Sequence, residues 1–326
     1  MNTVNPYPLL LKPPVKDYLW GGKRLKTEFG FETGEGPAAE AWVLSCHKDG
    51  QSVVENGELS GKTLSQALER MGPAAAGKKA TSFPYFPLLI KLIDAHDRLS
   101  VQVHPNDEYA LRVEGEYGKT EMWYVVDCEP GAQLIYGFNR NLSRDELRRR
   151  IEDNTLTEVC NFVPVNKGDV FFIQAGTLHA IGAGILIAEV QQNSNTTYRV
   201  SDYGRLGADG KPRPLHIDKA VDVTVAAPPA LPYGAVGEWV TIDGGLRRPL
   251  ADCDLFTSEL LKVTGNCLVG ADDSFLSLLC LEGDAQLTCG DMRLSVHKGS
   301  SLFLPAGLSA QLISDQQPAL FLSSTV

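Results

Sequence analysis

Three short stretches of the chain carry side chains that commonly ligate metal ions. Gln102 and His104 lie two residues apart in an alternating apolar run, so a strand here would project both side chains from one face. Glu121 opens a second apolar run, and His179 follows a third run and a glycine turn. Nitrogen and oxygen donors of these types suit a borderline divalent cation and leave a further position for water or substrate. The sequence therefore predicts one site per chain for a borderline divalent cation such as Zn²⁺.

A histidine in a strand is more often a structural residue than a ligand, and the chain has six histidines. The spacing around His179 favours a ligand. The run from Gly168 to His179 fits G-x5-P-x-G-x2-H, a signature of cupin barrels, except that Gln174 replaces the proline. The first run resembles the other cupin signature only loosely, with Gln102 where a histidine is usual. The pattern indicates a cupin barrel that carries the predicted ligands.

Four phrases of the chain also resemble the short, type I mannose-6-phosphate isomerases of bacteria: KLIDAHDRLSVQVHPND, GKTEMWYVVD, GTLHAI and EVQQNSNTTYRVSDYGR. With WGG near residue 20 and RPLHIDKAVDV near residue 216, the resemblance runs from about Tyr18 to Val223. It implies a zinc-dependent enzyme that interconverts mannose 6-phosphate and fructose 6-phosphate. A phosphorylated hexose would then be its substrate.

The resemblance implies substrate-binding roles for residues around the metal. Lys91, inside the apolar run LLIKLID, would attract the sugar phosphate together with Ser100. On residue type alone, Lys91 is equally a strand lysine whose ammonium reaches water. Trp20 and Glu40 resemble positions near the substrate cleft, although packing and surface roles suit both equally. Asn195 stands where other members carry aspartate, so it could hold a sugar hydroxyl but could not act as a base.

Arg199 and Lys119 are the predicted catalytic residues. The guanidinium of Arg199 is always charged and presents several fixed donors, which suits a phosphate or a developing enediolate oxygen. Residue type alone favours a surface ion pair with Asp202, and the resemblance reverses that preference. Lys119 precedes Glu121 by two residues, lies on the same side of the expected strand, and is the candidate for proton transfer. Gly118 replaces a histidine of longer members, so no role of that histidine transfers.

An internal repeat indicates a second barrel. GDVFFIQAGTLHA at 168–180 resembles GSSLFLPAGLSAQ at 299–311, where Ala310 replaces the histidine and no Gln-x-His pair precedes. The sequence therefore predicts a mainly β fold of two cupin domains, which are jelly-roll-like β-barrels, with a few short helices. The predicted N-terminal catalytic domain spans 1–230 and includes a flanking N-terminal segment and a helical insertion near 141–159. The predicted C-terminal barrel spans 231–326 and lacks metal ligands.

The composition of the chain limits the classes of partner and the cellular compartment that we expect for it. Its 326 residues are 43% hydrophobic and 21% charged, as in soluble globular proteins, and are enough for two domains. Asp and Glu outnumber Lys and Arg by 40 to 30, and no basic tract indicates nucleic acid as a partner. No apolar run approaches the roughly 20 residues that span a bilayer, and the first residues, MNTVNPYPLLLKPP, lack the pattern of a signal peptide. Seven scattered cysteines favour reduced thiols in a cytoplasmic protein. We expect a monomer or a weak homodimer.

Two other functions fit part of the pattern. An iron-dependent cupin oxygenase would use His104, His179 and Glu121 as two histidines and a carboxylate with open positions. Gln102 as a fourth ligand, and cations suited to an anion, argue against it. A non-catalytic, metal-containing bicupin that binds sugar phosphates is the other alternative, because the second barrel keeps the fold without a metal. Four retained ligands beside a cationic pocket favour catalysis.

Overall fold

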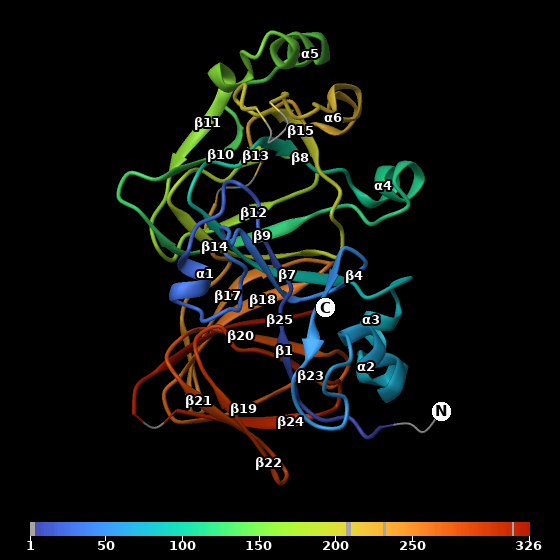
Figure 1. Ribbon diagram of the computed structural model, residues 1–326, viewed down its shortest axis with the longest axis vertical. Helices are drawn as coiled ribbons and strands as arrows, with labels where there is room; N and C mark the ends of the chain where they lie inside the picture. The colour runs from blue at the N-terminus through green and yellow to red at the C-terminus, as the bar shows by residue number, and fades with distance from the viewer. Residues whose placement is uncertain (1–3, 207–209, 231–232, 315) are drawn as a thin grey trace. The chain divides into compact units, whose positions relative to one another are not determined.

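The structure, a computed structural model, describes residues 4–206, 210–230, 233–314 and 316–326. These residues form strands β1 to β25 with six short α-helices between them (Figure 1). The prediction of a mainly β chain with a few short helices is confirmed. None of the described helices is long and apolar enough to cross a membrane. All seven cysteines are free.

The chain divides into two compact units that are assembled from separate segments. Unit 1 contains Met1–Asp17, Lys23–Leu92 and Ala235–Val326, and unit 2 contains Tyr18–Gly22 and Ile93–Gly234. The predicted split near residue 230 follows chain order, whereas residues before 230 contribute to both units. The predicted metal ligands all fall in unit 2.

Unit 2 holds a five-stranded antiparallel sheet and three neighbouring strands of a second sheet. The five-stranded sheet has, in spatial order, β11 (Cys160–Pro164), β10 (Gln133–Phe138), β13 (His179–Ala180), β8 (Val101–Val103) and β15 (Tyr198–Ser201). The three strands of the second sheet are, in order, β12 (Val170–Ile173), β9 (Glu121–Cys128) and β14 (Ile185–Gln192).

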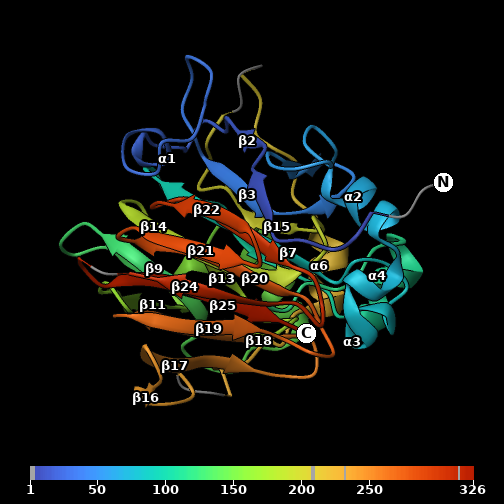
Figure 2. The same ribbon diagram turned by 90° about the horizontal axis from the view of Figure 1, so that it is seen from below.

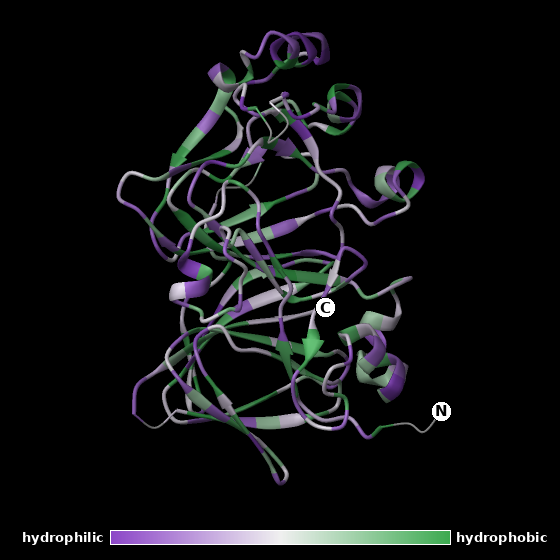
Figure 3. Ribbon diagram, viewed as in Figure 1, coloured by the Kyte–Doolittle hydropathy of each residue, from purple (hydrophilic) through white to green (hydrophobic). Residues whose placement is uncertain are grey.

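Strand alternation separates the two faces of the five-stranded sheet. Val101 and Val103 are fully buried in an apolar cluster that also contains Leu147 and Ile151 of α5 (Arg144–Glu152). Helix α6 (Ile217–Val223) adds residues to the same cluster, and Figure 1 shows α5 and α6 side by side. The outer surface of α5 is hydrophilic (Figure 3). Because the valines face the helices, the residues between and after them face the other way.

The second sheet of unit 2 is buried over most of its length. Every residue of β14 is buried, and so are the first six residues of β9. Polar side chains nevertheless occur at alternate positions near one end, where Glu121 pairs with Gln191 and Trp123 pairs with Glu189. Directly paired residues project from the same face. These strands therefore present two acids, an amide and an indole on one buried face.

Unit 1 has two sheets around its own apolar core. The larger sheet runs, in order, β16 (Val240–Ile242), β17 (Gly245–Asp252), β18 (Thr257–Val263), β25 (Ala319–Thr325), β20 (Leu276–Glu282), β23 (Ser301–Leu304), β1 (Leu9–Lys12) and β6 (Val53–Val54). The smaller sheet, whose strands are visible in order in Figure 2, is β19 (Asn266–Gly270), β24 (Ser309–Ile313), β21 (Ala285–Cys289) and β22 (Met292–Val296).

The second copy of the repeat forms part of this apolar core. Ala310, the counterpart of His179, is buried among leucines, valines and phenylalanine. In the part of the chain that the structure describes, only unit 2 has a cluster of His, Cys, Asp or Glu suited to a metal. Strand β1 joins the larger sheet of unit 1 by pairing Leu9 with Phe303.

The remaining elements are β2 (Val15–Lys16), β3 (Glu40–Leu44), β4 (Cys46–His47), β5 (Gly50–Gln51), β7 (Leu88–Ala95), α1 (Arg24–Thr27), α2 (Leu64–Met71), α3 (Gly77–Thr81), α4 (Asp107–Val113), η1 (Pro73–Ala75) and η2 (Leu156–Val159).

Candidate metal centre and active site

Four polar side chains form a row across the five-stranded sheet of unit 2. Tyr136 pairs with His179, His179 pairs with Gln102, and Gln102 pairs with Arg199. Since paired residues of neighbouring strands share a face, all four project from the side opposite the helices. His104, two residues after Gln102, continues on that side as the chain leaves β8. The register thus brings together residues that lie up to 97 positions apart in sequence, from Gln102 to Arg199.

Two backbone carbonyls orient the histidines of the site. The Nδ1 atom of His104 lies 2.9 Å from the carbonyl oxygen of Thr196, and the Nδ1 atom of His179 lies 2.9 Å from that of Thr177. A carbonyl only accepts a hydrogen bond, so each Nδ1 carries the proton and each Nε2 keeps its lone pair. This backbone support is typical of histidine ligands, because it fixes the ring and its tautomer.

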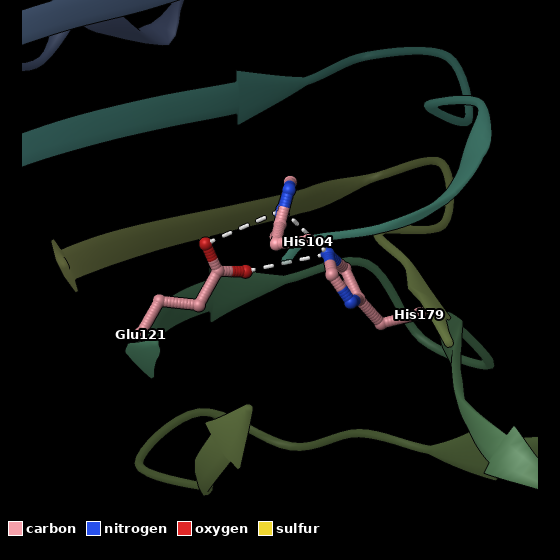
Figure 4. Close-up of side chains that lie close together, drawn as sticks. All are labelled: His104, Glu121 and His179. Carbon is pink, nitrogen blue, oxygen red and sulfur yellow. Dashed lines mark hydrogen bonds and ion pairs between the residues drawn. The ribbon is translucent and has the colours of Figure 1, made fainter. Parts of the chain in front are cut away.

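The two Nε2 atoms converge with the carboxylate of Glu121 (Figure 4). They are 3.1 Å apart, and they lie 3.6 Å (His104) and 3.4 Å (His179) from the two Glu121 oxygens. Two nitrogens bound tetrahedrally to one zinc ion at about 2.05 Å would be about 3.3 Å apart. All three side chains are almost completely buried. The donor types, spacing and burial therefore fit a divalent cation.

Burial keeps His179 of this cluster neutral. Loss of contact with water lowers the pKa of His179 to about 3, and the nearby Lys119 ammonium acts in the same direction. At neutral pH the imidazole is therefore uncharged, which is the form that binds metals.

Lys119 lies among the three donors. Its Nζ atom is 3.2 Å from Nε2 of His104, forms an ion pair with Glu121, and lies 3.7 Å from Oε1 of Glu189. The lysine side chain is only 4% exposed, so its charge is compensated by these groups rather than by water. The ammonium shows that the donor set accommodates a positive charge.

Glu189 is a buried acid of the site, for which the sequence predicts a place on the polar, cavity-lining side of a strand but no catalytic role. Nε1 of Trp123 donates to its Oε2 atom over 2.8 Å, while the ring of Trp123 meets His179 edge-on with centroids 5.3 Å apart. Trp123 therefore links the carboxylate to a metal ligand. The signal in the sequence was the polar alternation of Glu189 and Gln191 in an otherwise apolar strand.

Gln102 lies next to the three-residue cluster. Its amide nitrogen is 3.4 Å from Nε2 of His179. The nitrogen and oxygen of an amide are assigned from their surroundings, and a half-turn of this amide would direct the oxygen to the same place. The geometry is compatible with the predicted fourth ligand.

Arg199 is held by neutral groups. Its Nε atom lies 3.4 Å from Oγ of Ser100, and its Nη1 atom donates to the carbonyl oxygen of Pro214 over 3.1 Å. Asp202, the alternative partner considered from the sequence, is bound instead by Arg205 and Arg213. Partial burial lowers the pKa of Arg199, and the charge of Arg213 adds to this effect. In the described chain, no carboxylate forms an ion pair with the Arg199 guanidinium, which leaves its charge available for an anion.

The other three predicted substrate residues have different surroundings. Lys91 is buried in unit 1, 3.7 Å from Oε2 of Glu40 and above the ring of Trp42, so its ammonium does not reach water. Trp20 is buried in unit 2 against Tyr18. Asn195 is exposed, and its backbone N–H donates to Glu116 over 3.3 Å.

Comparison with protein families identifies two regions of the chain. Residues 9–124 match the family described as "Phosphomannose isomerase type I, catalytic domain". Residues 249–317 match "Mannose-6-phosphate isomerase, cupin domain". A mannose-6-phosphate isomerase of Streptococcus mutans is 38% identical over 298 residues, which cover 91% of this chain and 92% of the relative.

Solved structures extend this similarity to the fold. The mannose 6-phosphate isomerase of Bacillus subtilis superposes with a TM-score of 0.87 at 33% identity, covering 98% of this chain and 99% of its own. A mannose 6-phosphate isomerase described as bound with zinc and yttrium has the same fold, with a TM-score of 0.74, 20% identity and 98% coverage of both chains. The similarity therefore covers nearly the whole chain.

Proposed function

This chain belongs to the type I phosphomannose isomerases, and we propose that it interconverts mannose 6-phosphate and fructose 6-phosphate with one zinc ion per chain. The observation that carries this proposal is the buried convergence of His104, Glu121 and His179 on one point. We assign Gln102 as the fourth ligand. A zinc ion held there would act as a Lewis acid toward the oxygens at the first two carbons of the sugar.

Cationic side chains would bind the phosphate group of the substrate. Arg199 is partly buried, and Ser100 and a backbone carbonyl hold it rather than an acid, so its guanidinium can pair with a phosphate at full charge. We assign Ser100 to the same phosphate as a neutral donor. Lys91, which the family resemblance also assigns to the substrate, is a separate proposed binding residue, buried in unit 1 beside Glu40. Trp20 would border the cleft, and Asn195 would hold a sugar hydroxyl.

The isomerisation moves a proton between two adjacent carbons and builds negative charge on the oxygens that they carry. Lys119 is the residue that we assign to proton transfer, because its Nζ atom is buried beside Glu121, His104 and Glu189. Glu189 can exchange a proton with that ammonium, and Trp123 fixes its carboxylate. The alternative role of Arg199, in place of phosphate binding, is to stabilise the negative charge that develops on these sugar oxygens.

The free cysteines support the proposal of a cytoplasmic enzyme. Burial raises the pKa of Cys46, Cys160 and Cys280 to about 12, so these thiols stay protonated and unreactive. We further propose that the enzyme acts as a monomer or a weak homodimer.

The test of this function is turnover of mannose 6-phosphate by one preparation in three states: as purified, after chelation, and after zinc is restored. We expect activity to disappear with chelation and to return with zinc. Absence of turnover in every state would refute the proposed reaction. Full turnover after complete removal of metal would refute the role of the metal.

A further inference from the structure

Gln191 carries a buried acceptor atom that has no donor among the described residues. The residue is 0% exposed and lies near the end of β14. Its Nε2 atom donates to the carbonyl oxygens of Gln192 and Ser194, over 2.7 and 2.6 Å. Both of those partners only accept, so the amide cannot be turned around without losing two hydrogen bonds. Its Oε1 atom is therefore fixed in place and has no hydrogen-bond partner in the described structure.

The register of β14 places this amide on the face that carries the metal ligands. Gln191 is directly paired with Glu121, and the next pair on that face is Glu189 with Trp123, whose ring contacts His179. Paired side chains on antiparallel strands have their Cβ atoms about 5 Å apart. Gln191 is therefore the direct cross-strand neighbour of Glu121, the proposed metal-binding carboxylate.

The adjacent glutamine shows that the local structure can provide partners for both the oxygen and the nitrogen of such an amide. Gln192 projects from the opposite face, where its Oε1 accepts from the backbone N–H of Thr120 over 3.0 Å and its Nε2 donates to Asp107 over 2.8 Å. Buried polar atoms in proteins are nearly always hydrogen-bonded, because burying an unpaired acceptor is costly. The unpaired oxygen of Gln191 thus points to a donor that arrives with a ligand.

We propose that Oε1 of Gln191 accepts a hydrogen bond from a hydroxyl group of the bound sugar phosphate. The chemistry of the atom decides the type of group, since an amide oxygen repels a phosphate oxygen but accepts from a hydroxyl. Gln191 is then a specificity residue that distinguishes a polyhydroxylated ligand from a simple anion. This inference rests on the proposed function, because it takes the ligand to be a hexose phosphate.

Replacing Gln191 with methionine tests this role, because methionine has a similar length and no acceptor oxygen of this kind. The two hydrogen bonds of Nε2 are lost as well, and equilibrium unfolding in urea measures that separate effect on stability. We expect Gln191→Met to raise the KM for mannose 6-phosphate about tenfold, the effect of one lost hydrogen bond. The inhibition constant of inorganic phosphate, which has no sugar hydroxyls, should stay within about twofold, and the zinc content should remain one per chain. Gln133→Met, the same change at an exposed residue of β10, should alter none of these values.

Several results would overturn the inference. An unchanged KM would show that no ligand group uses this acceptor. Equal weakening of mannose 6-phosphate and inorganic phosphate would show a general disturbance of the pocket, and loss of zinc would assign the amide to the metal. If Gln191→Met does not fold, a crystal structure of the wild-type protein with fructose 6-phosphate decides. A sugar hydroxyl within hydrogen-bond distance of Oε1 is expected, and water or metal there would refute the inference.

These measurements separate this inference from the proposed function. The wild-type protein is assayed first, and lack of mannose 6-phosphate turnover there would refute the proposed function. Active wild-type protein combined with an unaltered Gln191→Met variant would refute only the inference.

Discussion

Replacing Trp123 with phenylalanine would remove one hydrogen bond from the buried site while keeping an aromatic ring. The indole N–H donates over 2.8 Å to Glu189, and both residues are at most 3% exposed. A hydrogen bond to a charged group contributes about 1.5 to 3 kcal/mol, and the space left by the smaller ring would cost about 1 kcal/mol more. We expect Trp123→Phe to lower the free energy of unfolding by about 2.5 to 4 kcal/mol.

The same change should also slow the reaction. Without the indole, the Glu189 carboxylate loses a donor that helps to fix its position, and Lys119 remains 3.7 Å away. We expect kcat to fall about 10- to 100-fold, because a misplaced proton-transfer group costs roughly that much, while KM changes little.

Equilibrium unfolding in urea and steady-state kinetics measure the two effects. Trp239→Phe is the matched control, because Trp239 is 39% exposed and lies in unit 1. Its unfolding free energy should change by less than about 0.5 kcal/mol, with unaltered turnover. If Trp123→Phe behaved like this control in both assays, the argument that the indole positions Glu189 would be refuted.

Three further predictions concern the anion, an acid of unit 1 and the metal. Arg199→Ala should raise the KM for mannose 6-phosphate about 10- to 100-fold, because a charge-assisted hydrogen bond to the phosphate is lost. The control Arg140→Ala, at an exposed position, should leave this KM unchanged. Equal effects of the two changes would exclude a phosphate role for Arg199. Burial raises the pKa of Glu259 against the opposing charge of Arg247, so the folded state binds this proton more tightly and stability falls as pH rises through the raised pKa. Glu259→Gln should therefore melt higher than wild type at pH 7 but not at pH 4, and a gain at both values would contradict this cause. Zinc at 100 times its Kd should stabilise the wild-type protein by about 2.7 kcal/mol in thermal or urea unfolding, and no stabilisation would contradict binding to the folded state.

Local patterns in the sequence were sufficient to predict the ligands that converge. The two-residue spacing of Gln102 and His104, and the glycine turn before His179, identify strand faces and turns without tertiary information. The structure brings His104, Glu121 and His179 together as that analysis predicts. Their burial and the carbonyl partners of both histidines required the fold, because those carbonyls belong to residues with no distinctive side chain.

The register between paired strands is the information that local sequence patterns do not contain. Glu189 and Gln191 are visible as polar residues in an apolar strand, but only their pairing with Trp123 and Glu121 places them in the site. In unit 1, the pairing of Leu9 with Phe303 joins the two ends of the chain in one sheet. Pairing over such a separation leaves no local signal, so chain order suggested a boundary near residue 230 instead.

The most direct test of the central claim is to measure zinc content and turnover on the same preparations of wild type and His179→Ala. We expect one zinc ion per chain and active isomerase in the wild type, and loss of both in the variant. His297→Ala, at an exposed histidine of unit 1, should retain both. Full turnover of mannose 6-phosphate by metal-free His179→Ala protein would contradict the account.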